Sequence, residues 1–465
     1  MARKPKIVIV GGGTSGLAAA YTLRSKYGSK LEVVVLEAAD RAGGRIAGEE
    51  IGGFSIHTGA SVFHESFETV QDLAENLGVP LTKSPRKKGG HLYRGGKLWG
   101  IYVGGSPRQM LTTVRTFLSF RLFTLKGLWQ SMRFFGMLKA RGNDIDFQDH
   151  SRMLDLDTPE SFAEFMKANS LVEYLEQTGE VDINCFTAGC SEEVGAALGM
   201  AMLWLWTLNQ SERSCLPGKG VGEFADALVG ACAEDTRLGT PVQRVVVEEG
   251  CVKGVMAGNV GNGDGFVEAD AVICAAPATK ALEIIPDLPP EARRILSRVT
   301  YSSCINMAIG LDANILPEGS HAAVFPPESG TFLTNVSNLA SMAPQAAPEG
   351  KSLVYALVIG EHARELFALS DDEIAGRIIE EISKYLPTMP EKPLFARVYR
   401  WPEALCLAPG GMLKEIYEMR QQKLVDLEGL FLAGDYMRMP SCNGALLSGV
   451  DAAGECASFV SRDTV

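Results

Sequence analysis

The chain has 465 residues, enough for two or three domains with a large core. Its apolar fraction of 46% and charged fraction of 22% are ordinary for a globular protein, and its net charge of −12 argues against a general nucleic-acid binder. Ten cysteines without C-x-x-C spacing and six histidines without paired spacing predict reduced thiols, with neither a disulfide framework nor a metal site. The basic first residues lead directly into a short apolar stretch and not into a signal peptide, so we expect a cytoplasmic protein.

A strand, a glycine turn and a helix open the chain. Residues 7–10 predict a buried strand that ends in Gly11-x-Gly13-x-x-Gly16, and a helical pattern follows. The first glycine permits the tight turn, the second lets the backbone approach a pyrophosphate, and the third lets helix and strand pack closely. Free N–H groups at the helix N-terminus would bind the phosphates.

A second apolar strand at residues 31–36 ends on Glu37. A carboxylate at this position can accept hydrogen bonds from both hydroxyls of a ribose, whereas it would repel a 2′-phosphate. The order of strand, glycine turn, helix, strand and acid therefore predicts a dinucleotide-binding βαβ unit.

The following segment narrows the nucleotide to FAD by resemblance. Residues 37–45 (EAADRAGGR) resemble the stretch after the second strand in the flavin amine oxidase superfamily, which includes monoamine oxidases, protoporphyrinogen oxidases and phytoene-type desaturases. The resemblance implies that the glycine pair lets the backbone pass under the diphosphate and that Arg45 neutralises it. Residues 57–61 (HTGAS) look like the segment that touches the flavin.

Three further segments agree with this family. Residues 429–435 (GLFLAGD) and 441–454 (SCNGALLSGVDAAG) resemble its closing motif, in which the Asp binds the ribityl–pyrophosphate region and the helix N-terminus faces the flavin pyrimidine ring. Residues 240–245 and 269–277 resemble its middle flavin segment, and Val242 would meet the adenine there through its backbone. The residues that we expect to bind FAD are Gly11, Gly13, Thr14, Ser15, Gly16, Glu37, Ala38, Gly44, Arg45, Gly59, Ala60, Ser61, Val242, Trp401, Gly434, Asp435, Ala445 and Leu446.

Because the flavin motifs are far apart in the sequence, the cofactor domain must be discontinuous. We predict an α/β fold in which residues 1–82, 215–300 and 395–465 form a Rossmann-like FAD-binding domain of the glutathione-reductase type. Residues 83–214 and 301–394 would form an inserted α+β substrate domain. An amphipathic helix is expected over 66–78, and antiparallel strands are expected over 242–260 with a turn at 259–265.

Two stretches of the substrate domain have unusual compositions. Residues 106–143 contain no acid and interleave seven basic residues with six aromatic ones. This mixture is typical of a membrane-facing helical segment over 106–141 that also admits a lipophilic substrate, and equally of two core-packing helices with solvated basic faces. Residues 194–208 are apolar on all sides but shorter than a membrane span, which favours a buried helix beside the substrate.

The sequence departs from monoamine oxidases at several positions. Alignment puts Asn443 and Leu446 where those enzymes carry two aromatic rings in front of the flavin, and Asn306 where they carry a lysine. Residues 400–410 look more like the protoporphyrinogen oxidase and phytoene desaturase branches. Cys406, within that segment, could form a thioether to flavin as in some amine oxidases, but its spacing favours a buried structural cysteine.

We identify no catalytic residue beyond the candidates His57, which could titrate near neutrality, and Tyr301; His64 is a further proton-handling candidate. The pattern indicates an FAD-dependent oxidoreductase that removes hydride from a carbon centre of a lipophilic, isoprenoid- or porphyrinogen-like substrate, with oxygen or a quinone as electron acceptor. The alternatives are an amine or amino-acid oxidase, a redox-neutral flavin isomerase and a non-catalytic flavin-bound protein. Peripheral membrane contact would accompany the first interpretation.

Overall fold

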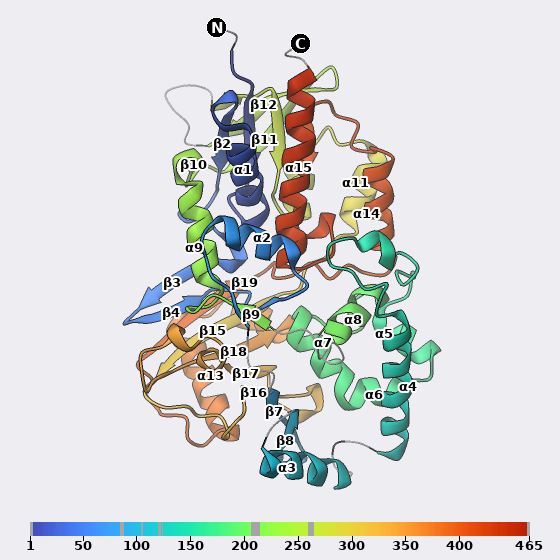
Figure 1. Cartoon of the computed structure of the whole chain (residues 1–465), viewed down its shortest axis with the longest axis vertical. Coiled ribbons are helices and arrows are strands. Elements are labelled where there is room, and N and C mark those ends of the chain that lie inside the picture. Colours follow the sequence, from blue (N-terminus) through green and yellow to red (C-terminus); the bar gives the residue numbers. More distant parts are fainter. Residues whose placement is uncertain are drawn as a thin grey trace.

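The computed structural model describes residues 3–83, 88–103, 106–119, 122, 124–205, 214–258 and 265–462. Two lobes lie one above the other, and both termini lie at the end of the upper lobe (Figure 1). The upper lobe contains the glycine turn, and the lower lobe contains the largest sheet. Strands from the beginning, middle and end of the sequence pair in the sheet of the upper lobe.

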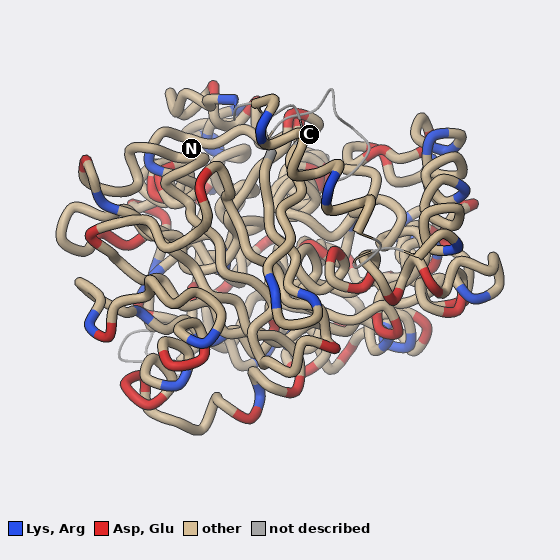
Figure 2. Tube along the Cα trace, turned by 90° about the horizontal axis from the view of Figure 1, so that it is seen from below, with Lys and Arg blue, Asp and Glu red and all other residues tan. Residues whose placement is uncertain are grey.

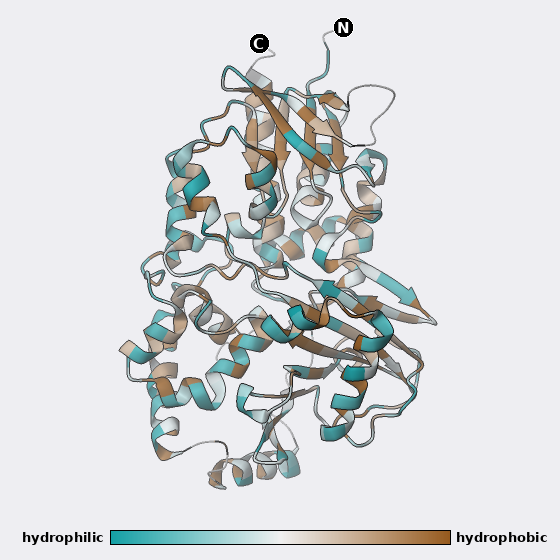
Figure 3. Ribbon diagram, turned by 180° about the vertical axis from the view of Figure 1, so that it is seen from behind, coloured by the Kyte–Doolittle hydropathy of each residue, from teal (hydrophilic) through white to brown (hydrophobic). Residues whose placement is uncertain are grey.

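A parallel five-stranded sheet forms the centre of the upper lobe. Its order is β10 (Thr236–Arg237), β2 (Glu32–Leu36), β1 (Lys6–Val10), β14 (Ala271–Cys274) and β20 (Leu430–Leu432). Except for the two-residue edge strand β10, these strands are nearly continuous apolar runs because both faces of the sheet are covered. Helices α1 (Thr14–Tyr27) and α15 (Cys442–Arg462) pack together on one face (Figure 1). The antiparallel strands β11 (Val242–Glu248), β12 (Cys251–Ala257) and β13 (Phe266–Glu268) lie on the other face of the sheet. Figure 3 shows the molecule from behind, with hydrophobic residues in brown on the strands of the upper lobe.

Shorter elements complete this lobe. The small sheets are β3 (Gly48–Ile51) with β4 (Phe54–His57), and β5 (Phe63–His64) with β9 (Ser214–Leu216) and β6 (Thr82–Lys83). The remaining helices are α2 (Glu68–Asn76), α9 (Val221–Ala231), α10 (Ala278–Ile284), α11 (Pro290–Ser297) and α14 (Met412–Gln421). The predicted amphipathic helix is confirmed as α2, and Gly78 follows it with a φ of +71°.

A seven-stranded sheet organises the lower lobe. Its order is β19 (Phe395–Trp401), β15 (Cys304–Leu311), β18 (Ser352–Ile359), β17 (Asn335–Asn338), β16 (Ala322–Val324), β7 (Lys88–Arg94) and β8 (Lys97–Val103). All pairs are antiparallel except β16 with β7. Strand β19 pairs with β15 along its length, although its residues fall within the segment 395–465 that we assigned to the cofactor domain.

The two faces of this sheet differ because side chains alternate along each strand. One face packs against α13 (Asp371–Tyr385) in a second core that contains Ile305, Met307 and Ile378. Cys304 and Asn306 alternate with Ile305 and Met307 along β15, so their side chains point to the opposite face of the sheet. Helix α12 (Gly360–Leu366) follows β18.

Helices flank the open face of the sheet: α3 (Pro107–Leu118), α4 (Leu125–Arg141), α5 (Phe162–Ala168), α6 (Val172–Tyr174), α7 (Glu180–Thr187) and α8 (Ala196–Leu203). The predicted buried helix is confirmed as α8, which is buried on all sides. In the described part of the chain, no helix is both long and apolar enough to cross a bilayer. Residues 120, 121 and 123 of the basic–aromatic stretch, 206–208 of the apolar stretch and 259–264 of the predicted turn lie outside the described residues.

Candidate functional site

A cavity of about 1780 Å³ is lined by residues of both lobes. Its upper part is bordered by the β1–α1 turn, the end of β2, the segment after β20 and the first turn of α15. Its lower part is bordered by the open face of the seven-stranded sheet and by α3, α4, α7 and α8. The predicted cofactor motifs therefore lie at one end, and the predicted substrate domain supplies the other.

The glycine turn leaves backbone N–H groups at the cavity. Gly11 has a φ of +102°, and its N–H donates to the carbonyl of Leu36 at 2.8 Å. Helix α1 begins after Gly13 without a side-chain cap, so the first N–H groups of the helix are available to a bound anion. A Cβ on Gly13 would meet no atom within 4 Å, whereas a Cβ on Gly16 would lie 1.9 Å from the carbonyl oxygen of Gly11. Gly13 thus leaves space for a ligand, and Gly16 permits close packing.

Glu37 is held in place by backbone donors. Its Oε2 accepts from the N–H of Gly12 at 2.6 Å, and its Oε1 accepts from the N–H of Ala39 at 2.8 Å. Each oxygen retains acceptor capacity on the cavity side, where Glu37 forms part of the lining. This orientation suits a carboxylate that accepts ribose hydroxyls.

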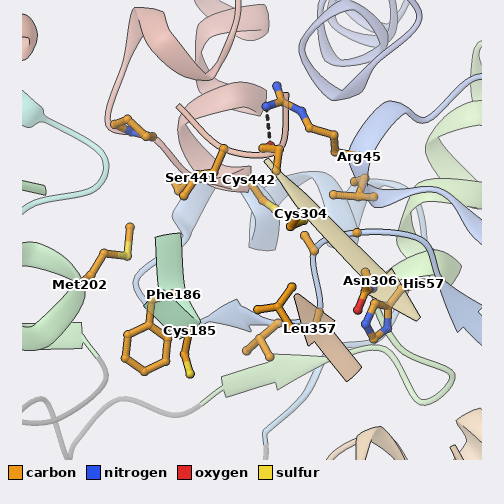
Figure 4. A pocket seen from close by; sticks show the side chains of 18 of the residues that line it. Arg45, His57, Cys185, Phe186, Met202, Cys304, Asn306, Leu357, Ser441 and Cys442 are labelled. Atoms are coloured by element: carbon orange, nitrogen blue, oxygen red, sulfur yellow. Dashed lines mark hydrogen bonds between the residues drawn. The ribbon is translucent and has the colours of Figure 1, made fainter. Parts of the chain in front are cut away.

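Arg45 and Asp435 join the first and last motifs. The Arg45 guanidinium donates to Asp435 Oδ2 at 2.9 Å and to the Ala404 carbonyl at 2.7 Å. Figure 4 shows Arg45 on the same side of the cavity as Ser441 and Cys442. Burial alone would lower the pKa of Arg45, but the charge and hydrogen bond of Asp435 outweigh it and raise that pKa well above its ordinary value. Asp435 Oδ1 is buried and has no hydrogen-bond donor among the described residues.

The first turn of α15 faces the same space. Ser441 Oγ accepts from the N–H of Gly444 at 2.9 Å and so caps the helix, and Ser441, Cys442 and Ala445 line the cavity. The upper part thus offers two helix N-termini, an acidic ribose acceptor and an unsatisfied carboxylate oxygen. These features fit FAD: α1 can hold its diphosphate, Glu37 its ribose and Asp435 a ribityl hydroxyl.

Most of the predicted cofactor residues meet at this cavity. Those on its lining are Gly11, Gly13, Thr14, Ser15, Glu37, Ala38, Gly44, Arg45, Gly59, Ala60, Ser61, Val242, Trp401, Gly434, Asp435 and Ala445. Gly16 lies behind the glycine turn, and Leu446 is fully buried away from the lining. Leu446 therefore packs in the core instead of contacting the cavity.

The proton-handling candidates differ in position. His57 lines the cavity, stacks on Tyr355 with ring centroids 4.0 Å apart, and donates its backbone N–H to the Tyr355 hydroxyl at 2.9 Å. Burial lowers the pKa of His57 to about 3, so its imidazole stays neutral near pH 7 instead of titrating there as we considered. His64 also lines the cavity. Tyr301 does not; its hydroxyl accepts from the N–H of Ala278 at 3.0 Å.

The positions that we compared with an aromatic cage require a correction. Asn443 is fully buried, its Oδ1 accepts from the N–H of Val70, and its Nδ2 donates to the carbonyl of Phe147. Neither Asn443 nor Leu446 lines the cavity. The absence of aromatic rings at these two positions therefore carries no argument against an amine substrate. Cys406 is likewise buried off the cavity, and its backbone N–H donates to Asp435.

The sheet supplies the floor of the lower part. Asn306 on β15 lies opposite Leu357 on β18, which lies opposite Asn335 on β17, and all three line the cavity. Asn306 Nδ2 is buried without an acceptor among the described residues. Figure 4 shows Cys185, Phe186 and Leu357 on the side of the cavity away from Arg45. The apolar helical residues that complete this part are Phe117, Leu128, Met132, Phe135, Val181, Phe186, Met202 and Leu205.

Several lining residues were not identified from the sequence. Cys304, Asn335 and Asp182 have no motif around them; only the alternation along strands 304–311 and 335–338 could have indicated which residues share a face. Cys442 lies in the closing motif at 441–454, but we did not assign it a role. All ten cysteines are free thiols. Within the described ranges, no group of three His, Cys, Asp or Glu side chains is arranged to hold a metal ion.

Comparisons with known proteins cover nearly the whole chain. A family model described as flavin containing amine oxidoreductase matches residues 14–457. Coproporphyrinogen III oxidase of Bacillus subtilis (strain 168) is 25% identical over 479 residues, which cover 94% of this chain and 96% of the relative. Probable polyamine oxidase 4 of Arabidopsis thaliana is 26% identical over 484 residues, covering 98% and 88%. Cyclohexylamine oxidase from Brevibacterium oxydans IH-35A shares the fold with a TM-score of 0.73 at 17% identity, over 99% of this chain and all (100%) of that structure.

Proposed function

The chain belongs to the flavin-containing amine oxidoreductase family, and from this premise we propose that it removes hydride from a carbon centre of a lipophilic substrate and forms a double bond. It is an FAD-dependent oxidoreductase, and FAD supplies the two-electron acceptor when bound. The relatives are named for porphyrinogen and amine substrates alike, so the substrate class has to be argued from the cavity.

The observation that carries the proposal is the composition of the lower cavity. Its helical wall is mostly apolar and aromatic, with Asp182 as the charged side chain that the described residues of α3, α4, α7 and α8 contribute to it. Its sheet floor contributes the neutral amides of Asn306 and Asn335. Five of the charged residues on the lining, Glu37, Arg45, Lys280, Glu403 and Asp435, belong to the segments that we assigned to the cofactor domain. A predominantly apolar substrate would fill the remaining space with little desolvation cost.

The chain's own residues would bind and orient the substrate without a charged base at the carbon that gives up the hydride. The imidazole of His57 is neutral, and the Cys304 and Cys442 thiols stay protonated because burial raises the pKa of each to about 12. The unpaired Asn306 amide can donate a hydrogen bond to a polar group near the oxidised carbon. The protein's contribution is thus positioning and exclusion of water, with oxygen or a quinone as the final electron acceptor.

Helices α3 and α4 support delivery of such a substrate from a membrane surface. Among the described residues, seven of the eleven exposed large apolar side chains lie on these two helices: Met110, Leu111, Val114, Leu118, Leu125, Trp129 and Met132. Basic residues accompany them, and the helices contain no acid. Met132 is both 67% exposed and part of the cavity lining. An interfacial helical pair beside the entrance would let a lipophilic molecule pass directly from lipid to the cavity.

Two alternatives remain open to test. An amine oxidase is favoured by the polyamine oxidase relative and is no longer opposed by the residues at positions 443 and 446. A redox-neutral isomerase would use the same apolar cavity but would release no electrons to oxygen.

Anaerobic reduction of the bound flavin distinguishes these functions. The holoenzyme would be mixed with isoprenoids, porphyrinogens and unsaturated lipids in one panel, and with primary amines and amino acids in the other. Bleaching of the flavin spectrum by a lipophilic compound alone is the expected result, and bleaching by an amine alone would overturn the proposal. If neither panel bleaches the flavin, dehydrogenation is wrong, and isomerisation would then be assayed with the flavin reduced beforehand.

A further inference from the structure

Asp182 is a charged residue on the lining of the lower cavity, where its neighbours are neutral. It lies on α7, the helix that also contributes Val181, Cys185 and Phe186 to the same wall. Figure 4 shows that Cys185 and Phe186 lie across the cavity from Arg45, so this wall is remote from the cofactor motifs. Asp182 therefore stands apart from the charged groups that surround the nucleotide.

The Asp182 side chain is part-buried, and its carboxyl makes no hydrogen bond or ion pair with the described residues. Burial is the sole cause that raises its pKa, to about 7. The titratable groups that face it are the Tyr174 phenol and the Cys185 thiol, and burial raises the pKa of both, so neither is charged near neutrality. Near pH 7 the carboxyl is thus ionised in part of the molecules and lacks a donor.

The position of Asp182 on α7 determines how far its carboxyl lies from the Asn306 end of the sheet, where we expect the oxidised carbon. Cys185, one helical turn along α7, accepts a hydrogen bond from Asn335 Nδ2 at 3.5 Å. Asn335 is two strands away from Asn306 in the sheet, a separation on the order of 10 Å. A substrate that reaches from the flavin side of the sheet to α7 would therefore place its far end at Asp182.

We propose that Asp182 binds a hydrogen-bond-donating end group, a hydroxyl or an ammonium, of an otherwise apolar substrate and selects against a carboxylate at that end. A part-buried carboxyl on an apolar wall is costly without a donor, and a ligand that supplies the donor lowers that cost. An ionised ligand carboxylate would instead meet a like charge beside the apolar residues of this wall. This inference rests on the proposed function, because it assumes that the lower cavity holds a largely apolar substrate.

Binding of three ligands of equal chain length tests the inference. Dodecylamine, dodecanol and dodecanoate would be titrated into the anaerobic holoenzyme by calorimetry, so that no turnover is needed. The variants are Asp182→Asn and, as a matched control, Glu176→Gln, which changes an exposed carboxyl outside the cavity. In the unchanged protein at pH 8 we expect dodecylamine to bind about ten- to a hundredfold more tightly than dodecanoate.

Asp182→Asn should abolish this preference, and Glu176→Gln should keep it. Affinity for dodecylamine should also rise about tenfold between pH 6 and pH 8 in the unchanged protein, as the carboxyl ionises, and stay constant in Asp182→Asn. Tighter binding of dodecanoate than of dodecylamine, an unchanged preference in Asp182→Asn, or no binding of any of the three would overturn the proposal. Binding that follows these expectations while no lipophilic compound reduces the flavin would leave Asp182 as the anchor and overturn the proposed oxidation instead.

Discussion

Asp182 lowers the stability of the folded protein when its carboxyl is ionised, and in our proposal the same carboxyl binds the substrate. Its folded pKa of about 7 lies above the value near 3.9 of an unfolded aspartate. The folded state therefore binds the proton more strongly, so the favourable contribution is present at low pH and is lost as pH rises through about 7. Asp182→Asn should raise the stability of the protein by about 1–2 kcal/mol at pH 8, less than full burial would give because the side chain is part-exposed, and by little at pH 4.

Thermal unfolding of the two proteins across this pH range measures the difference. The stability gain should grow between pH 4 and pH 7 and then level off. A variant that is less stable than the unchanged protein at pH 8 would contradict the burial of an unpaired carboxyl.

Asp435 gives a second prediction at the residue scale. Asp435→Asn keeps an oxygen for Arg45 but removes the charge, and it should weaken FAD retention about ten- to a hundredfold, which corresponds to one charge-assisted hydrogen bond. The ratio of flavin to protein absorbance after dialysis measures retention. Asp235→Asn is the matched control, because it breaks another ion pair of a buried aspartate, with Arg24, away from the cavity. Equal loss of flavin from both variants would show a general loss of stability instead of a role for Asp435.

The residues of the nucleotide end could be predicted because their chemistry leaves a local pattern. Gly13, Glu37 and Asp435 each follow or precede a strand at a fixed spacing. Leu446 was misplaced because the closing motif runs into a helix, and one step along a helix turns the side chain by about 100°. Ala445 therefore lines the cavity while Leu446 points into the core. Asp182 had no local signal, since the docking of α7 on the cavity depends on tertiary packing.

At the scale of elements, the packing of α1 against α15 fixes the two helix N-termini on one cavity. A Cβ at Gly449 of α15 would lie 2.0 Å from the carbonyl oxygen of Ser15, whereas a Cβ at Gly454 would meet nothing within 4 Å. Gly449→Ala should destabilise the protein by about 1–3 kcal/mol and weaken FAD retention, because the helices must separate. Gly454→Ala should be neutral or stabilise by up to about 1 kcal/mol. Chemical denaturation and flavin retention of the pair provide the measurement, and equal effects would contradict the close contact at Gly449.

The exposed face of α3 and α4 makes a prediction about lipid. Figure 2 views the molecule from the end at which α3 lies, and positive and negative residues are interspersed over the molecule in this view. Trp129→Ser combined with Met132→Ser should reduce sedimentation with vesicles of anionic phospholipid at least tenfold, because each buried apolar side chain contributes about 1.5–3 kcal/mol.

The matched control for vesicle binding is Phe266→Ser, which removes an exposed aromatic ring from β13 in the upper lobe. It should bind vesicles like the unchanged protein. If the double variant also binds as strongly, or if the unchanged protein ignores the vesicles, the helical pair is not a membrane surface.

Single helices and strands were easier to predict from the sequence than the elements that pack beside them in the fold. The strands at 242–257 and the helix at 68–76 carry clear periods in their own sequence. The strand beside β19 could not be predicted from the sequence. Residues 400–410 resemble a segment of the family, but β19, which overlaps the start of this segment, pairs with β15 in the sheet of the lower lobe. The order of the seven strands depends on long crossovers that leave no local pattern.

For the whole molecule, the sequence motifs predicted one discontinuous lobe around FAD, and the structure brings segments from both ends of the chain together there. What the sequence could not provide is the shape of the second half of the cavity, which is built from a sheet face and several helices that meet only on folding. The type of reaction therefore has to be established by counting the hydrogens that the substrate loses to the flavin.

A single anaerobic turnover with a compound that bleaches the flavin tests this count most directly. The product would be analysed by mass spectrometry and compared with the amount of flavin reduced. We predict a product that has lost two hydrogens from adjacent atoms, including the carbon that gives up the hydride, in a one-to-one ratio with reduced flavin. Reduced flavin without an equal amount of a product that has lost two hydrogens would contradict dehydrogenation, and release of ammonia with a carbonyl product would show that the oxidised bond belongs to an amine.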